Sequence, residues 1–204
     1  MKNRASTIWE KSSKSLENYY KFIERKNDRF RLELIDLLYV SNFKGGNSTI
    51  NETEESLEIK LIEYSTVLRQ INNEFGLALL SELSNQSVER LIELANRFLD
   101  LRKKTDTTID GFKSSFLSTL LHIYFPNLYP ILDRRLLLNL DLIEPVNLNK
   151  SRQVKDIGNF YNQLIWKVRE IQQNSNRSIR EIDYEYFVKP LPEWAKSKTY
   201  ETEN

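Results

Sequence analysis

Residues 51–71 read NETEESLEIKLIEYSTVLRQI and carry the clearest structural signal in the sequence. Apolar side chains recur in this segment every three or four positions, the spacing that gathers them on one face of an α-helix. Acidic residues come first, where the positive end of the helix dipole favours them. The segment therefore predicts a long amphipathic helix capped by Asn51. The side chains of its apolar face are Leu57, Leu61, Tyr64, Leu68 and Ile71.

The helical period continues on both sides of this segment. Leu16, Tyr19, Tyr20 and Ile23 have helical spacing, and Asn27 or Asp28 is placed to cap a second helix. With only 5 Gly and 5 Pro in 204 residues, the chain has few breaks for short strands. We predict an all-α fold, a compact domain of roughly eight to ten helices. The later helices are expected over residues 77–83, from a cap at Ser87 to about 102, 109–125, 133–140, 152–173 and 178–187, the last opened by the capping box Ser178 and Glu181.

Length and composition limit the domain organisation and the chemistry. We predict one domain over residues 1–190 and a flexible C-terminal tail over residues 191–204. The chain has no cysteine and one histidine, which excludes zinc–thiolate sites, cysteine nucleophiles and multi-histidine metal sites. Phosphate-loop and dinucleotide motifs are absent, so we expect no metal and no cofactor. Gly45-Gly46 after Lys44 predicts a turn, or alternatively an anion-binding nest.

Charge and hydropathy bear on the partners. The 30 Lys and Arg against 29 Asp and Glu argue mildly against a dedicated nucleic-acid binder, although a local basic face would be compatible with them. No apolar run approaches the ~20 residues that span a bilayer. Residues 1–15 lack the apolar stretch of a secretory signal. We therefore expect a cytoplasmic protein that does not enter a membrane.

Candidate chemistry gathers in residues 109–135, IDGFKSSFLSTLLHIYFPNLYPILDRR. His122 lies within a predicted helix among apolar neighbours, either as a packed ring or as a proton carrier. Asp133 follows Pro130 and is expected to cap the next helix. A carboxylate held at a rigid helix start can serve only as that cap, or can also stabilise a cation or activate water. Asp133 and His122 are therefore the candidate catalytic residues.

This segment resembles the helix–hairpin–helix DNA glycosylases, and most closely bacterial 8-oxoguanine-glycosylase-like proteins. Residues 109–115 match the hairpin and its exit, Leu121-His122 matches a Leu-His pair, and residues 129–133 match the turn that carries the catalytic aspartate. Residues 180–183 also resemble the start of the last helix of that group. The resemblance covers about 30 residues well.

The resemblance implies a glycosylase-like helical fold and roles for individual residues. Asp133 would assist cleavage of the base–sugar bond. Tyr124, Phe125 and Tyr129 would form a pocket for the extruded base, although they are equally typical of a core. The residues expected to contact duplex DNA are Gly111, Lys113, Ser114, Arg134 and Arg135.

Two departures from the family pattern limit these implications. Lys113 stands where the family hairpin has a second glycine, which weakens the match to a phosphate-binding hairpin. Ser115, or Thr119 in the bacterial pattern, stands where bifunctional members have a catalytic lysine, and neither can form a Schiff base. An enzyme of this class would therefore be monofunctional, with water as the nucleophile.

Three functions remain open at this point. The first is a DNA-interacting protein of glycosylase-like fold, either a monofunctional N-glycosylase or a catalytically degenerate relative. The second is a protein–protein interaction module, for example a subunit of a host-defence or mobile-element system. The third is an unrelated hydrolase or transferase that uses Asp133 and His122.

Overall fold

The protein is described here by a computed structural model that covers residues 4–46 and 49–196. Over these residues the chain is all-α, as predicted, with one isolated β-bridge between Leu148 and Val154 and no strand. The α-helices of this part of the chain are α1 (Arg4–Glu24), α2 (Leu34–Phe43), α3 (Glu54–Phe75), α4 (Asn85–Asp100), α5 (Ser114–Tyr124), α6 (Arg134–Asn139), α7 (Tyr161–Ser175) and α8 (Ile179–Val188). Short 3₁₀ helices lie at Leu80–Glu82, Leu101–Lys103, Pro145–Asn147, Ile157–Phe160 and Glu193–Ala195.

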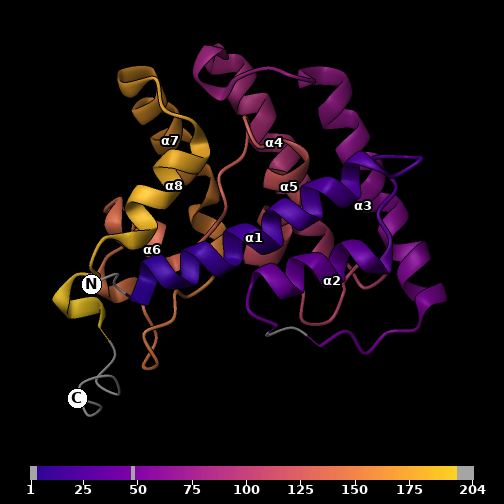
Figure 1. Cartoon of the computed structure of the whole chain (residues 1–204), viewed down its shortest axis with the longest axis horizontal. Helices are drawn as coiled ribbons and strands as arrows, with labels where there is room; N and C mark the ends of the chain where they lie inside the picture. Colours follow the sequence, from indigo (N-terminus) through magenta and orange to yellow (C-terminus); the bar gives the residue numbers. More distant parts are fainter. Residues whose placement is uncertain (1–3, 47–48, 197–204) are drawn as a thin grey trace.

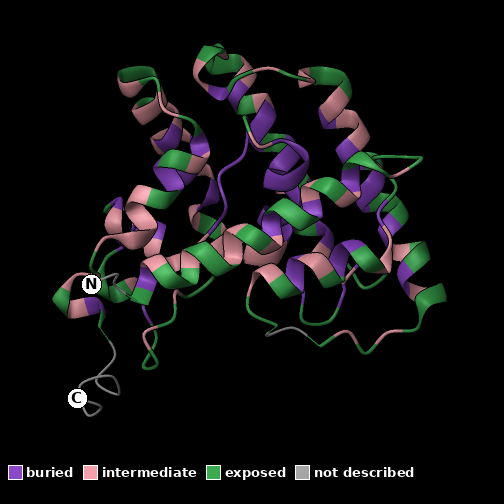
Figure 2. Cartoon of the chain, in the orientation of Figure 1, coloured by how far each residue is buried: buried purple, intermediate pink, exposed green. Residues whose placement is uncertain are grey.

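Helix α5 lies at the centre of the molecule, with α1, α2 and α4 packed around it (Figure 1). Helix α1 crosses one face and contacts both α2 and α8, whereas α6 packs on α8. Nine of the eleven residues of α5 are buried, and the purple colour of its ribbon in Figure 2 reflects this. Because α5 is enclosed on several sides, its buried residues form no single stripe and include the polar side chains of Ser118, Thr119 and His122.

The amphipathic segment that predicted the fold class forms α3. All five residues of its predicted apolar face are at most 1% exposed, and they belong to the hydrophobic core. The cap of this helix, however, is Thr53, whose hydroxyl accepts a hydrogen bond from the amide of Ser56, so the prediction of Asn51 was wrong. The chain from Asn51 to Thr53 stays non-helical, which leaves the carboxylate of Glu52 free to bind elsewhere.

Other helix boundaries also differ from those predicted. Helix α4 is capped by Ser84, not Ser87, and the helix expected over 109–125 begins only at Ser114, after a turn. Residues 77–83 contain a single 3₁₀ turn, and the helix expected over 152–173 is the 3₁₀ helix Ile157–Phe160 followed by α7. Helix α2 begins at Leu34, well after Asn27 and Asp28. Propensity and capping signals thus located α2, α4, α5 and α7 but not their first residues, and the helix expected over 77–83 was wrong.

The C-terminal segment packs beyond residue 190. Ala195 is fully buried, and its carbonyl accepts a hydrogen bond from Nη2 of Arg134 at 2.5 Å. The 3₁₀ helix Glu193–Ala195 brings Trp194 against the core. The rest of the expected tail, residues 197–204, lies outside the described residues. The packed domain therefore extends to about Ala195.

Candidate functional site

One cavity of about 310 Å³ lies where the first and last α-helices approach the segment before α6. We call it the Asp133 cavity. It receives side chains from α1, from the end of α2, from the non-helical segment before α6, and from α8. The residues that line it are Ile8, Trp9, Ser12, Phe43, Lys44, Gly45, Ile131, Asp133, Arg180, Asp183 and Phe187.

Asp133 both caps α6 and lines this cavity. Its Oδ1 accepts a hydrogen bond from the amide of Arg135 at 2.8 Å, which satisfies one of the free amides of the helix start. The residue is partly exposed, so the cap does not bury it. The backbone just before it is fixed to α5: Ser115 donates to the carbonyl of Leu132 at 2.9 Å, and Ser118 accepts from the Leu132 amide at 2.9 Å. The carboxylate is therefore held at a defined position beside the cavity.

Asp183 is a second carboxyl in the same cavity, and sequence reasoning did not select it as a site residue. It lies on α8 with 3% of its surface exposed, and Nη1 of Arg180 donates to its Oδ2 at 2.7 Å. Burial raises the pKa of Asp183 to about 6; the positive charges of Arg180 and Lys44 oppose this rise, whereas the charge of Asp133 adds to it. One feature of the sequence could have pointed to Asp183. It follows the inward-facing Ile182 within residues 180–183, the motif that resembles the start of the last helix of the glycosylase-like group.

Aromatic rings form much of the wall around these carboxyls. Trp9 packs against Tyr184 and Phe187, with ring centroids 5.4 and 5.5 Å away. The guanidinium of Arg180 lies 3.6 Å from the centroid of the Trp9 ring, a cation–π contact. Burial lowers the pKa of Arg180, while Asp183 opposes the shift. The cavity thus combines flat aromatic surfaces with two carboxyls and two cations.

Lys44 is the second cation of the cavity. It is the C-cap of α2, where Gly45 and Gly46 have positive φ angles of 86° and 71°. The Gly46 amide donates to the carbonyl of Ser41 at 2.8 Å, so this turn closes the end of α2 and its amides are not arranged for an anion. Burial lowers the pKa of Lys44, whereas the charges of Asp133 and Asp183 raise it.

His122 does not reach the cavity. It is fully buried, with Nδ1 2.8 Å from the carbonyl oxygen of Tyr129, and Nε2 has no hydrogen-bond partner among the described residues. Burial lowers the pKa of His122 to about 3, and the charges of Arg180 and Lys44 add to this shift. His122 is therefore a neutral packed ring near pH 7, and the structure does not bring it together with Asp133.

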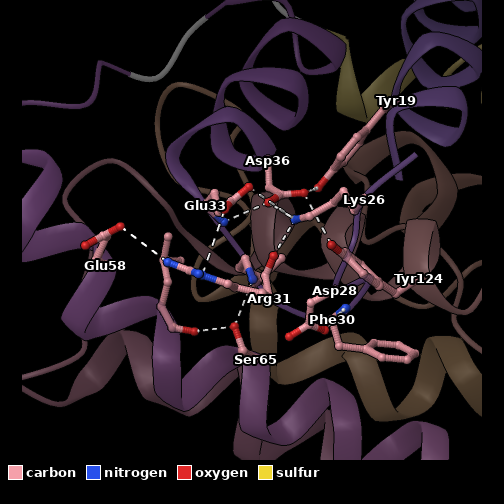
Figure 3. Close-up of polar contacts among 12 residues, drawn as sticks. Tyr19, Lys26, Asp28, Phe30, Arg31, Glu33, Asp36, Glu58, Ser65 and Tyr124 are labelled. Atoms are coloured by element: carbon pink, nitrogen blue, oxygen red, sulfur yellow. Dashed lines mark hydrogen bonds and ion pairs between the residues drawn. The ribbon is translucent and has the colours of Figure 1, made fainter. Parts of the chain in front are cut away.

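The three aromatic residues expected to form a base pocket lie in the core. Tyr124 donates to Oδ1 of Asp36 at 3.3 Å, and Figure 3 shows both residues in the buried cluster with Tyr19 and Lys26. The hydroxyl of Tyr129 donates to the carbonyl of Leu91 at 3.1 Å, and Phe125 stacks near Phe30. None of the three lines the Asp133 cavity. The aromatic walls come instead from Trp9, Phe43 and Phe187.

The hairpin before α5 is occupied by contacts within the protein. Gly111 has a φ of 80° and is exposed, as is Lys113, but Ser114 is 2% exposed and packs beside Gly158. The amide of Asp110 donates to Oε1 of Glu52 at 3.0 Å. A carboxylate of the protein itself therefore already binds one backbone amide of this hairpin.

Arg134 and Arg135 hold the C-terminal segment. Besides the contact of Arg134 with Ala195, Nε of Arg135 donates to the carbonyl of Phe187 at 2.5 Å and Nη2 donates to that of Lys189 at 2.8 Å. Burial lowers the pKa of Arg135. Both arginines are partly buried and bind carbonyls of the protein itself. These bonds do not support the expected role of the two side chains as phosphate contacts.

Comparison with known protein families, with curated proteins and with solved structures found no match to this chain. In the described residues, no group of three or more His, Cys, Asp or Glu side chains is placed to hold a metal ion. None of the helices described is long and apolar enough to cross a bilayer.

Proposed function

We propose that the protein binds a nucleobase in the Asp133 cavity and hydrolyses the N-glycosidic bond that joins the base to its sugar. The observation that carries this proposal is the double use of Asp133, which is fixed as the cap of α6 and also lines a cavity walled by Trp9, Phe43 and Phe187. Aromatic rings stack on bases of any sequence, and a cavity of about 310 Å³ is at the small end of ligand pockets.

The proposed chemistry needs a stabilised cation and a water molecule. When the bond between C1′ and the base nitrogen breaks, positive charge develops on the sugar, and the Asp133 carboxylate stabilises it. Water then adds to C1′ and leaves an abasic sugar. Ser115 and Thr119, which stand at the lysine positions of bifunctional enzymes, use their hydroxyls on the carbonyls of Leu132 and Ser115. This supports a monofunctional reaction.

Duplex DNA is the proposed source of the base. Lys113 is exposed and is the N-cap of α5. Two residues later, the hydroxyl of Ser115 donates to the carbonyl of Leu132, so this end of α5 lies beside the start of α6. Lys103, at the end of the 3₁₀ helix Leu101–Lys103, and Lys104 after it are exposed as well. These lysines, rather than Arg134 and Arg135, are the candidates for contacts with phosphate.

The test uses labelled duplexes that contain 8-oxoguanine, uracil or alkylated bases, with abasic sites revealed by alkali. We expect base release by the wild type and a loss of about 100-fold or more in Asp133→Asn. Asparagine is as good a helix cap as aspartate, so this variant keeps α6. The matched control is Asp28→Asn, an exposed acid outside the cavity.

Three results would overturn parts of the proposal. Base release that is unchanged in Asp133→Asn would remove Asp133 from the reaction. No base release from any duplex, with no binding that weakens as salt rises, would reject DNA as the substrate. Strand cleavage before alkali treatment would point to an imine on Lys44, the amine that lines the cavity, and would reject the monofunctional assignment.

A protein–protein interaction module is the second candidate, and one observation favours it. Ile59 and Ile62 on α3 are 69% and 61% exposed, one helical turn apart, beside a groove that also contains Arg31 and Arg69. Exposed apolar residues rimmed by charge are typical of contact surfaces. This candidate predicts that Ile59→Glu with Ile62→Glu abolishes association with a protein partner, whereas Asp133→Asn leaves that association unchanged.

A further inference from the structure

The Asp133 cavity holds two carboxyls in contrasting surroundings. Asp133 is partly exposed, accepts an amide hydrogen bond and lies at a helix start. Asp183 lies on the inner face of α8, is 3% exposed, and shares the cavity wall with Phe43 and Phe187. A buried carboxyl and a partly exposed carboxyl in one cavity can divide two catalytic roles between them.

The neighbour of Asp183 on α8 holds one of its carboxyl oxygens. Nη1 of Arg180 donates to its Oδ2 at 2.7 Å, and the same carboxyl lines the Asp133 cavity. A carboxyl that is almost fully buried and lines a cavity is placed to meet a group of the ligand. Trp9, whose ring stacks with Arg180, fixes the guanidinium that in turn holds the carboxyl in place.

The charges that act on Asp183 come from three elements. Arg180 lies on the same helix, Lys44 on the end of α2 and Asp133 at the start of α6. Helix α1 contributes the hydroxyl of Tyr20, whose own pKa is raised to about 12, mainly by burial. Burial outweighs the two cations and raises the pKa of Asp183 to about 6, so an appreciable fraction of the carboxyl is protonated near neutral pH.

We propose that Asp183 is the general acid that protonates the departing base while Asp133 stabilises the sugar cation. This inference rests on the proposed function. As the C1′–N bond breaks, its electron pair passes to the base, and the Asp183 proton moves to a nitrogen or oxygen of that base. Water supplies hydroxide to C1′, and its proton passes to solvent, from which Asp183 is protonated again. The net reaction consumes one water molecule.

A structural role for Asp183 is the alternative explanation. Its contact with Arg180 supports the packing around Trp9, so any loss of Asp183 could disturb the cavity. Asp183→Asn keeps an oxygen that can accept from Arg180 but has no carboxylic proton to donate. Asp183→Glu keeps the acid. Comparing the two variants separates proton donation from packing.

The experiment measures base release from two duplexes under single-turnover conditions. One contains 8-oxoguanine or uracil, which leave as neutral bases after protonation. The other contains 7-methylguanine, whose base already carries a positive charge and leaves without an added proton. For the neutral base we expect Asp183→Asn to lose about 10²- to 10⁴-fold, the usual contribution of general acid catalysis. For 7-methylguanine we expect a rate close to that of the wild type.

The pH profile gives an independent readout. The wild-type rate with the neutral base should fall as pH rises above about 6, because Asp183 loses the proton that it donates. The rate with 7-methylguanine should not fall in that range. Asp183→Glu should recover part of the rate with the neutral base, and Asp133→Asn should lower both rates.

The outcomes distinguish this inference from the function on which it rests. Equal losses on both duplexes in Asp183→Asn, or no loss on either, would overturn the role of Asp183 as acid even if Asp133→Asn is inactive. No release of any base by the wild type would overturn the proposed function and the inference together.

Discussion

Substitution of His122 gives a quantitative test of the core. The ring is fully buried, and its pKa is lowered to about 3, mainly by burial. In the unfolded chain the ring titrates near its ordinary value of about 6.5. Below that pH the unfolded state therefore binds a proton that the folded state does not bind until about pH 3. As the pH is lowered through this window, the free energy of unfolding therefore decreases, by up to about 1.4 kcal/mol per pH unit.

His122→Leu removes this titration, because leucine carries no ionisable group. Between about pH 7.5 and pH 5 the wild type should lose about 2 kcal/mol more stability than the variant, since the unfolded histidine is largely protonated at the lower pH. The variant also loses the hydrogen bond to Tyr129, but that effect does not depend on pH and cancels in the comparison. Other titrating groups, such as Asp183, are common to both proteins.

Urea unfolding followed by tryptophan fluorescence at several pH values measures this difference. The two proteins should show parallel stability above about pH 7 and diverge steadily as the pH falls. A difference that stays constant from about pH 7.5 to pH 5 would refute the reasoning. It would mean that the folded protein protonates His122 as readily as the unfolded chain does.

Two further stability predictions follow from buried contacts, and both are measured by chemical unfolding. Asp36→Ala should cost about 3–5 kcal/mol, because it leaves the Lys26 ammonium, whose side chain is 5% exposed, without its buried partner 2.6 Å away. Asp28→Ala, which breaks an exposed ion pair, should cost less than about 1 kcal/mol, and equal losses would contradict this account. Gly158→Ala should cost about 1–3 kcal/mol because its Cβ would lie 2.7 Å from Oγ of Ser114. Adding Ser114→Ala should restore part of that loss.

The sequence predicted the fold class correctly because periodic apolar spacing is a local property. The stripe of α3 and the capping box of Ser178 and Glu181 depend on residues a few positions apart, and both are present. The cap of α6 by Asp133 is present for the same reason. Helix starts were less certain, since Ser84 and Ser87 have the same chemistry and only the tertiary path of the chain selects between them.

The site could be predicted only in part. Asp133 was selected because a proline, an acid and a helix start lie together in the sequence. Its partners Trp9, Lys44 and Asp183 come from α1, the end of α2 and α8, and no local pattern joins them. His122 was selected for its residue type, but the burial that keeps it neutral depends on helices packed around α5. Composition could not show that Arg134 and Arg135 bind carbonyls of the last segment.

Because α6 is short, the position of Asp133 depends on residues that lie outside the cavity. A helix of six residues has little stability of its own, so its position is set by its tertiary anchors. Arg135 binds the carbonyls of Phe187 and Lys189, and Asn139 binds that of Tyr186. These anchors join α6, whose N-cap is Asp133, to the same helix that carries Asp183. In evolutionary terms, selection on the spacing of the two carboxyls would act on Arg135 and Asn139 as well, although neither lines the cavity.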